Sequence, residues 1–151
     1  MPKPHRFTKK NWQVCAETDK SECWSVVEPH LRMVSKKIMS VKNGPLLFVT
    51  FNKPKSIFAE FAYYGEYPFA KGSTVELDID GKSFALGTVN DWAWPVDKAT
   101  NKRVIKAMKR GNVAILRGRT SKGSVVEDTF TLSGFTAATK SAAKKCGLTF
   151  K

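Results

Sequence analysis

The side chains that could do chemistry in this 151-residue chain are three cysteines, two histidines, two acidic pairs and a cluster of bases. An odd number of cysteines permits one disulfide and leaves one thiol. The chain has no CxxC motif, and neither histidine stands at zinc-ligand spacing from a cysteine. We therefore expect no metal and no cofactor. The cysteines and histidines are Cys15, Cys23, Cys146, His5 and His30.

Two acidic pairs, Asp78/Asp80 and Glu127/Asp128, are the candidates for acid–base catalysis. At strand spacing Asp78 and Asp80 share one face, opposite the apolar residues, where solvent reaches them. Such a pair lacks the desolvation that tunes catalytic carboxylates. The chain also has no glycine-rich phosphate loop and no nucleophile elbow. We predict that the protein is not an enzyme and has no catalytic residues.

Basic residues dominate the charge, with 26 Lys and Arg against 13 Asp and Glu and a net charge of +13 at pH 7. Residues 98–126 contain nine bases and no acid. This asymmetry favours an anionic partner such as an acidic lipid, a glycan or a host protein surface. A solvated surface that only keeps the chain soluble is the alternative interpretation. The candidate contact residues are Lys98, Lys102, Arg103, Lys106, Lys109 and Arg110.

Two tryptophans, Trp92 and Trp94, precede these bases in a stretch (90–95) that we expect to form an aromatic loop. With the tyrosines of residues 63–67 they could stack nucleic-acid bases, which makes nucleic-acid binding the alternative function. Lysine outnumbers arginine, however, and arginine is the residue that reads phosphate and guanine with two hydrogen bonds. Buried or loop-anchoring aromatics are the commoner interpretation, so nucleic acid is the less favoured partner.

Short strands and two helices must position these residues. Asp80-Gly81 predicts a tight hairpin. Asp97 is expected to cap a helix at 98–110 that ends at Gly111. Apolar patterning predicts strands at 11–16, 23–28, 46–51, 56–63, 74–79, 82–89, 112–118 and 125–132.

A second helix is expected after the last of these strands, with Ser133 as its N-cap. Phe135, Ala138, Ala142 and Cys146 follow at spacings of 3, 4 and 4 residues. These positions share one helical face, so Cys146 should point inward toward the sheets.

The pattern as a whole predicts a mainly β protein, an immunoglobulin-like β-sandwich of about eight short antiparallel strands with two decorating α-helices. We expect a flexible basic N-terminal arm at 1–10 and a single β-sandwich domain at 11–151. Residues 31–40 show no clean period. No apolar run approaches the ~20 residues of a membrane span. The first residues lack the apolar core of a signal peptide, which leaves either a cytosolic protein or a mature exported one.

A series of short motifs runs in order along residues 12–146. They are a tryptophan strand (12–14) followed by Cys23, a Thr-X-basic-Pro type stretch (49–54), Gly-X-Tyr-Pro-Phe (65–69), Gly72-Ser73, Asp-X-Ala-Trp (91–94), Ala-Met-Lys-X-Gly (107–111), Asp-Thr-Phe-X-Leu-X-Gly-Phe-X-Ala-Ala (128–138) and Cys146. In their order and spacing they resemble the invasion-associated locus B family of bacterial envelope and secreted proteins.

The resemblance implies a periplasmic or secreted protein whose signal peptide has been removed, in an oxidising compartment, with an immunoglobulin-like β-sandwich. It implies a non-enzymatic role in virulence, through host interaction, or in the envelope. We place that role on the basic surface. No catalytic residues carry over, because the family has no agreed set.

The family pattern also favours a disulfide between Cys23 and Cys146, with Cys15 left over as a small buried residue. Pairing Cys15 with Cys23 across the intervening hairpin is the alternative. A bridge that closes a long loop removes more entropy from the unfolded chain, which favours the first pairing. Some family members have a second cysteine pair in mid-chain, and residues 24–145 of this chain contain no cysteine.

Overall fold

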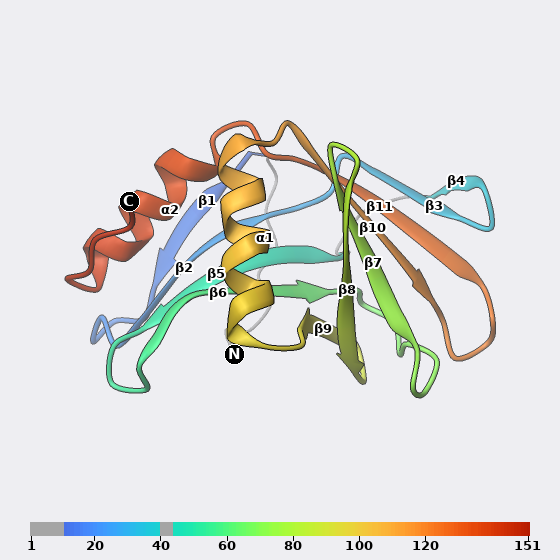
Figure 1. The fold of residues 1–151 in the computed structure, drawn as a ribbon, viewed down its shortest axis with the longest axis horizontal. Coiled ribbons are helices and arrows are strands. Elements are labelled where there is room, and N and C mark those ends of the chain that lie inside the picture. The colour runs from blue at the N-terminus through green and yellow to red at the C-terminus, as the bar shows by residue number, and fades with distance from the viewer. Residues whose placement is uncertain (1–10, 40–43) are drawn as a thin grey trace.

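The computed structural model describes residues 11–39 and 44–151, in which eleven β-strands and two α-helices are found. The arm expected at 1–10 lies outside the described residues. The strands are β1 (Gln13–Ala16), β2 (Glu22–Val27), β3 (Leu31–Val34), β4 (Lys37–Met39), β5 (Leu46–Asn52), β6 (Ile57–Tyr64), β7 (Thr74–Ile79), β8 (Lys82–Val89), β9 (Trp92–Pro95), β10 (Val113–Arg119) and β11 (Val125–Thr131). The helices are α1 (Lys98–Arg110) and α2 (Phe135–Lys145) (Figure 1).

The strands form one antiparallel sheet in the order β1-β2-β5-β6-β9-β8-β7-β10-β11-β3-β4. The sheet curls, so that its two halves face each other across the main core (Figure 1). The indole N–H of Trp12, beside β1, donates to the carbonyl oxygen of Thr131 at 2.9 Å. The rings of Tyr63 on β6 and Phe130 on β11 lie 6.2 Å apart. The predicted mainly β, sandwich-like fold with two helices is confirmed.

The strand count exceeds the predicted eight because two segments were misjudged. Residues 31–39 form the β3–β4 hairpin, whose turn residues Ser35 and Lys36 both have positive φ, at 48° and 67°. This turn lacks the Asn-Gly or Asp-Gly pair that marks such hairpins in a sequence. The expected aromatic loop is also wrong, because Trp92 and Trp94 belong to strand β9, which pairs with β8 and with the end of β6.

Other local predictions are confirmed. All seven residues of β5 are buried, as expected for a continuous apolar run. In β7, Val75, Leu77 and Ile79 are buried while alternate residues face outward. The β7–β8 turn is made by Asp80 and Gly81 at φ 48° and 91°, the turn geometry that this dipeptide favours.

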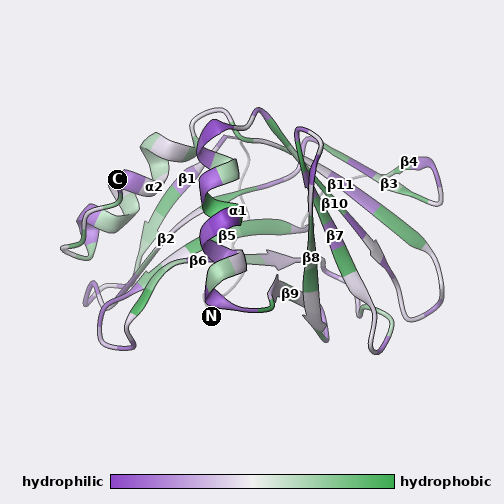
Figure 2. Cartoon of the chain, viewed as in Figure 1, coloured by the Kyte–Doolittle hydropathy of each residue, from purple (hydrophilic) through white to green (hydrophobic). Residues whose placement is uncertain are grey.

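Helix α1 has the predicted limits. The Asp97 carboxylate accepts a hydrogen bond from the backbone N–H of Thr100 at 2.7 Å. Gly111 follows the last turn, and a Cβ there would lie 2.7 Å from a methyl carbon of Ile79, so only glycine fits the approach to β7. Hydrophilic and hydrophobic bands alternate along α1 (Figure 2), because Val104 and Met108 are buried while Lys102, Lys106 and Lys109 face solvent.

Helix α2 packs on β1 and β2, but its predicted cap is wrong. Gly134, not Ser133, precedes the helix at φ 85°, with no side-chain capping bond. The chain turns sharply from β11 into α2, and glycine adopts the left-handed conformation at this corner at little cost. The helix is fixed by buried Phe135 and by a 2.8 Å hydrogen bond between the hydroxyls of Ser25 and Thr139.

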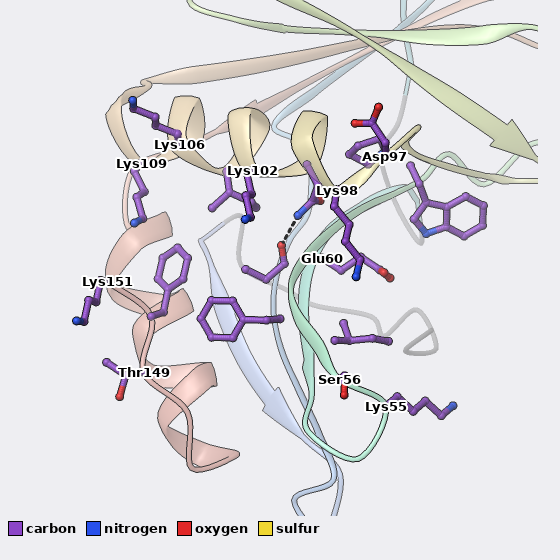
Figure 3. A pocket seen from close by; sticks show the side chains of 18 residues that line it. Lys55, Ser56, Glu60, Asp97, Lys98, Lys102, Lys106, Lys109, Thr149 and Lys151 are labelled. Carbon is purple, nitrogen blue, oxygen red and sulfur yellow. Dashed lines mark hydrogen bonds between the residues drawn. The ribbon is translucent and has the colours of Figure 1, made fainter.

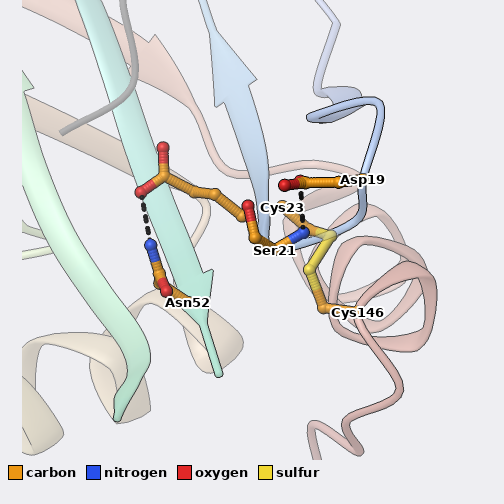
Figure 4. Close-up of a disulfide and its surroundings, with 6 residues drawn as sticks. Asp19, Ser21, Cys23, Asn52 and Cys146 are labelled. Carbon is orange, nitrogen blue, oxygen red and sulfur yellow. Dashed lines mark hydrogen bonds between the residues drawn. A yellow bond between two sulfur atoms is a disulfide. The ribbon is translucent and has the colours of Figure 1, made fainter. Parts of the chain in front are cut away.

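A disulfide joins Cys23 of β2 to Cys146 at the end of α2, with 6.0 Å between the two Cα atoms (Figure 4). The favoured pairing is therefore confirmed. Cys15 is a free, half-buried thiol opposite Trp24 in the β1–β2 register. Because neighbouring strand residues point to opposite faces, Cys15 and Cys23 lie on opposite sides of the sheet, which excludes the alternative.

We expect Cys146→Ala to lower the free energy of unfolding by about 2–5 kcal/mol, because the bridge closes a loop of 123 residues. Denaturant unfolding monitored by circular dichroism measures the difference. Cys15→Ala is the matched control and should cost less than about 1 kcal/mol. Thiol titration of the unreduced, denatured wild-type protein should find one thiol, and finding three would contradict the bridge.

Candidate functional site

A groove of about 1210 Å³ lies between α1 and the adjoining edge of the sheet (Figure 3). Its walls come from α1, from residues 55–60 at the start of β6, from Trp94 and Pro95 at the end of β9, and from residues 149–151. These segments are far apart in the sequence, so the groove is a product of the tertiary fold.

Lysines from three of these segments converge on the groove. Helix α1 contributes four of them at successive spacings of 4, 4 and 3 residues, which places them on one helical face. The Nζ of Lys109 lies 4.5 Å from the centre of the Phe150 ring, a cation–π contact that ties α1 to the C-terminal segment. The six lysines of the groove are Lys55, Lys98, Lys102, Lys106, Lys109 and Lys151.

The structure therefore divides the six predicted contact residues between two sides of α1. Lys98, Lys102, Lys106 and Lys109 line the groove. Arg103 and Arg110 lie on the other flank, where they line a smaller depression of about 620 Å³ together with Lys106 and with Asp80. The two arginines therefore lie in a second basic depression, which Lys82 also lines, and do not line the groove.

Two acids, Asp97 and Glu60, also line the groove, on the side where α1 begins, whereas Lys106, Lys109 and Lys151 gather toward the other end (Figure 3). Hydrogen bonds from Thr100, chiefly from its backbone N–H, lower the pKa of Asp97 below its usual value. Asp97 is thus a helix cap that stays ionised. The uncompensated positive charge lies at the end of the groove away from this cap.

The floor of the groove is apolar. Phe58 is 52% exposed, and its ring meets the buried Phe51 ring edge-on at 5.2 Å between centroids. Phe51 in turn contacts Phe150. Ile105 of α1 and Trp94 of β9 complete this surface. The groove therefore combines a wide apolar surface with a rim of lysines.

Asn101 fixes α1 against the sheet. Its side-chain oxygen accepts from the backbone N–H of Phe61 at 3.0 Å, and its Nδ2 donates to the carbonyl oxygen of Ala59 at 2.9 Å. The amide thereby takes the place of a neighbouring strand on the edge of β6, where β9 pairs only with Tyr63 and Tyr64. No sequence pattern signals this role, because an anchoring Asn on a helix looks the same in the sequence as a solvated one.

Trp92 and Trp94 share a face of β9 but have different surroundings. Trp94 lines the groove, while Trp92 packs on Phe48 and Tyr64 on the outer face of the sheet. Their rings stack at 6.1 Å with 12° between planes. Of the tyrosines in 63–67, Tyr63 is fully buried in β6, and none lines the groove.

The Glu127/Asp128 pair splits across the sheet. Asp128 is fully buried and receives two hydrogen bonds from the Arg32 guanidinium, at 2.7 and 2.8 Å, and one from the Tyr63 hydroxyl. Arg32 also donates to the carbonyl oxygen of Gly65 at 2.6 Å. Burial raises the pKa of Tyr63 well above its usual value, so its hydroxyl remains a donor. Both carboxylate oxygens of Asp128 are therefore engaged by partners inside the protein.

The remaining acidic candidates are also engaged in structural contacts. Glu127 faces outward and accepts from Arg117 at 2.6 Å. Asp78 accepts from the backbone N–H of Gly81 in the hairpin turn, and Asp80 accepts from the backbone of Asn112 and Val113 at the start of β10. The groove, and not an acidic pair, is therefore the candidate site.

Comparison with models of protein families, with curated proteins and with solved structures finds no match for this chain. Within residues 11–39 and 44–151, no helix is long and apolar enough to cross a membrane. The part of the chain that the structure describes also contains no cluster of three or more metal-binding side chains. Fold and groove together define a mainly β, disulfide-bonded protein with a lysine-lined apolar groove.

We expect Asn101→Leu to lower the free energy of unfolding by about 1–3 kcal/mol, because it removes two hydrogen bonds and leaves backbone groups of Ala59 and Phe61 without them. Denaturant unfolding measures the effect. Exposed Asn112→Leu serves as the control and should change stability by less than about 0.5 kcal/mol. Equal effects of the two substitutions would show that Asn101 does not anchor α1.

We expect Asp128→Asn to cost about 3–5 kcal/mol, because it removes the buried carboxylate partner of Arg32 and leaves only the more exposed Glu66, at 3.8 Å, to balance that charge. The neighbouring Glu127→Gln removes an ion pair that is open to solvent and should cost less than about 1 kcal/mol. Thermal and denaturant unfolding of the two variants check this difference. Similar losses at both positions would contradict the assignment of Asp128 as the central buried charge.

Proposed function

We propose that this protein is a non-catalytic binding protein whose basic groove holds an anionic partner. The convergence of six lysines on one groove carries the proposal, because only two acids line the same surface. Like charges brought together without compensating acids repel each other, and an anionic ligand relieves that repulsion. A surface that served solubility alone would not need to gather its lysines around an apolar depression.

We further propose a periplasmic or secreted location and a host-interaction or envelope role of the kind that the resemblance to the invasion-associated locus B family implies. The Cys23–Cys146 disulfide supports an oxidising compartment, since such bridges are rare in the cytosol of most organisms. The partner classes that fit the groove are an acidic lipid, a sulfated or carboxylated glycan, and an acidic protein surface.

Nucleic-acid binding is the second candidate, and one observation favours it. Trp94 lies in the groove beside Lys98 and Lys102, so an aromatic ring and phosphate-binding charges occur together. Export from the cytoplasm would remove this candidate. Failure of a single-stranded oligonucleotide to bind at moderate salt would do the same.

The test is titration of the protein with fluorescent heparin, and with vesicles containing phosphatidylglycerol, over a series of salt concentrations. Lys102→Gln combined with Lys106→Gln should weaken binding about tenfold near 0.1 M salt, because each lysine contributes roughly 0.5–1 kcal/mol to a solvent-exposed contact. The affinity of the wild-type protein should fall steadily as salt is raised.

The matched control carries Lys140→Gln and Lys144→Gln, which remove the same charge from the exposed face of α2. Its affinity should stay within about twofold of the wild-type value at the same salt concentration, since long-range attraction is screened. An equal loss in both double variants would indicate attraction by net charge without a site, and a flat salt titration would overturn the proposal.

A further inference from the structure

We propose that the ligand of the groove is a single-chain anionic amphiphile, such as a lysophospholipid, with its acyl chain on the apolar floor and its headgroup among the lysines. The inference rests on the proposed function, because it specifies the partner of the same groove. It names a ligand class in which apolar surface and negative charge are part of one small molecule.

The first argument is the apolar floor, because a ligand without apolar groups would make no favourable contact with it. Phe58, which is 52% exposed, lines the groove together with the partly buried Ile57, Trp94 and Pro95, and the largely buried Ile105 and Phe150 lie among them. Exposed apolar surface rimmed by polar groups is typical of ligand-binding grooves. A sulfated glycan would leave this surface in water, whereas an acyl chain would cover it.

Local backbone strain places Phe58 there. Ala59 has a φ of 50°, which is unusual for a residue other than glycine, and the β5–β6 register shifts between Thr50 and Asn52. Bulges of this kind redirect side chains and are concentrated at functional sites. The bulge is stabilised by Asn101, which holds the carbonyl oxygen of Ala59. A backbone conformation that costs free energy thus holds the exposed Phe58 on the floor of the groove.

The charge distribution locates the headgroup. Asp97 and Glu60 lie where α1 begins, while Lys106, Lys109 and Lys151 lie toward its other end (Figure 3). An anionic headgroup at the lysine end meets positive charge away from the carboxylates of Asp97 and Glu60. Lysine suits this task, because its ammonium group is a point charge that holds a phosphate without requiring a fixed geometry.

A nucleic acid fits the floor less well. Base stacking requires free aromatic faces, and one face of the Trp94 ring is already covered by Trp92. The other floor residues Ile57 and Ile105 are aliphatic and offer no stacking surface. A molecule that combines an apolar chain with a negative charge matches the groove better than a nucleic acid does.

The experiment is isothermal titration calorimetry of the full chain with myristoyl lysophosphatidylglycerol and with myristoyl lysophosphatidylcholine, both below their critical micelle concentrations. Glycerol phosphate and heparin are the probes for charge without a chain. The lysophosphatidylglycerol should bind about tenfold more tightly than its zwitterionic counterpart, because the lysines act on net negative charge. Glycerol phosphate should bind at least about tenfold more weakly than the lysophosphatidylglycerol, because it lacks the chain.

Phe58→Ser should weaken lysophosphatidylglycerol binding about tenfold and leave heparin binding within about twofold, because it removes floor area but no charge. Lys106→Gln with Lys109→Gln should weaken both. Val125→Ser is the control, since Val125 is 43% exposed on β11 and does not line the groove. Circular dichroism verifies that each variant is folded.

Four outcomes overturn the inference. Unchanged lysophosphatidylglycerol affinity in Phe58→Ser shows that the floor is not used. Heparin binding that depends on the lysines, without binding of the lysophosphatidylglycerol, removes the amphiphile but leaves the proposed function intact. Binding of neither heparin nor either lysophospholipid rejects both. An oligonucleotide that binds through Phe58 in place of the lipid assigns the groove to nucleic acid.

Discussion

A single buried carboxylate links the two halves of the curled sheet. Asp128 on β11 accepts hydrogen bonds from Arg32 on β3 and from Tyr63 on β6, so one side chain joins three strands. A charge in the core is tolerated only when it is paired and hydrogen-bonded, and these partners satisfy that requirement. The position of β6 relative to β11 is fixed by this contact. Because the groove is built against the far end of β6, its shape depends on the same interaction.

The groove itself follows from how the sheet covers an exposed edge. Strand β9 pairs with only the last two residues of β6, and α1 lies along the rest of that edge with Asn101 replacing a strand neighbour. A helix is about 10 Å wide, whereas neighbouring strands are about 4.8 Å apart, so a helix cannot fill a strand position closely. A depression therefore remains between helix and sheet. Its lysine rim comes mainly from the exposed face of α1, and its apolar floor comes from Ile105 of α1 together with the segments beside the helix.

Elements with a local physical cause could be predicted from the sequence. The limits of α1 follow from a capping aspartate, a narrow apolar stripe and Gly111 as the residue that ends the helix. The β7–β8 turn follows from Asp80-Gly81. The β3–β4 hairpin and β9 were missed because hydrogen bonds from other strands make them strands. The partner of β3 is β11, and the partners of β9 are β6 and β8. No property of the short segments themselves distinguishes them from loops.

The sequence by itself determined that the protein is mainly β, that α1 carries a basic face, and that Cys146 points toward the sheet, since these depend on periodicity and caps. Only the tertiary structure decided which bases share a surface. It places Lys106, Lys109, Phe58 and Lys151 around the same groove and Arg103 on the opposite flank of α1. It also separated the two neighbouring acids at 127 and 128, one to solvent and one to the core. These outcomes depend on contacts between different segments of the chain, and no local pattern encodes a contact whose partner belongs to another segment.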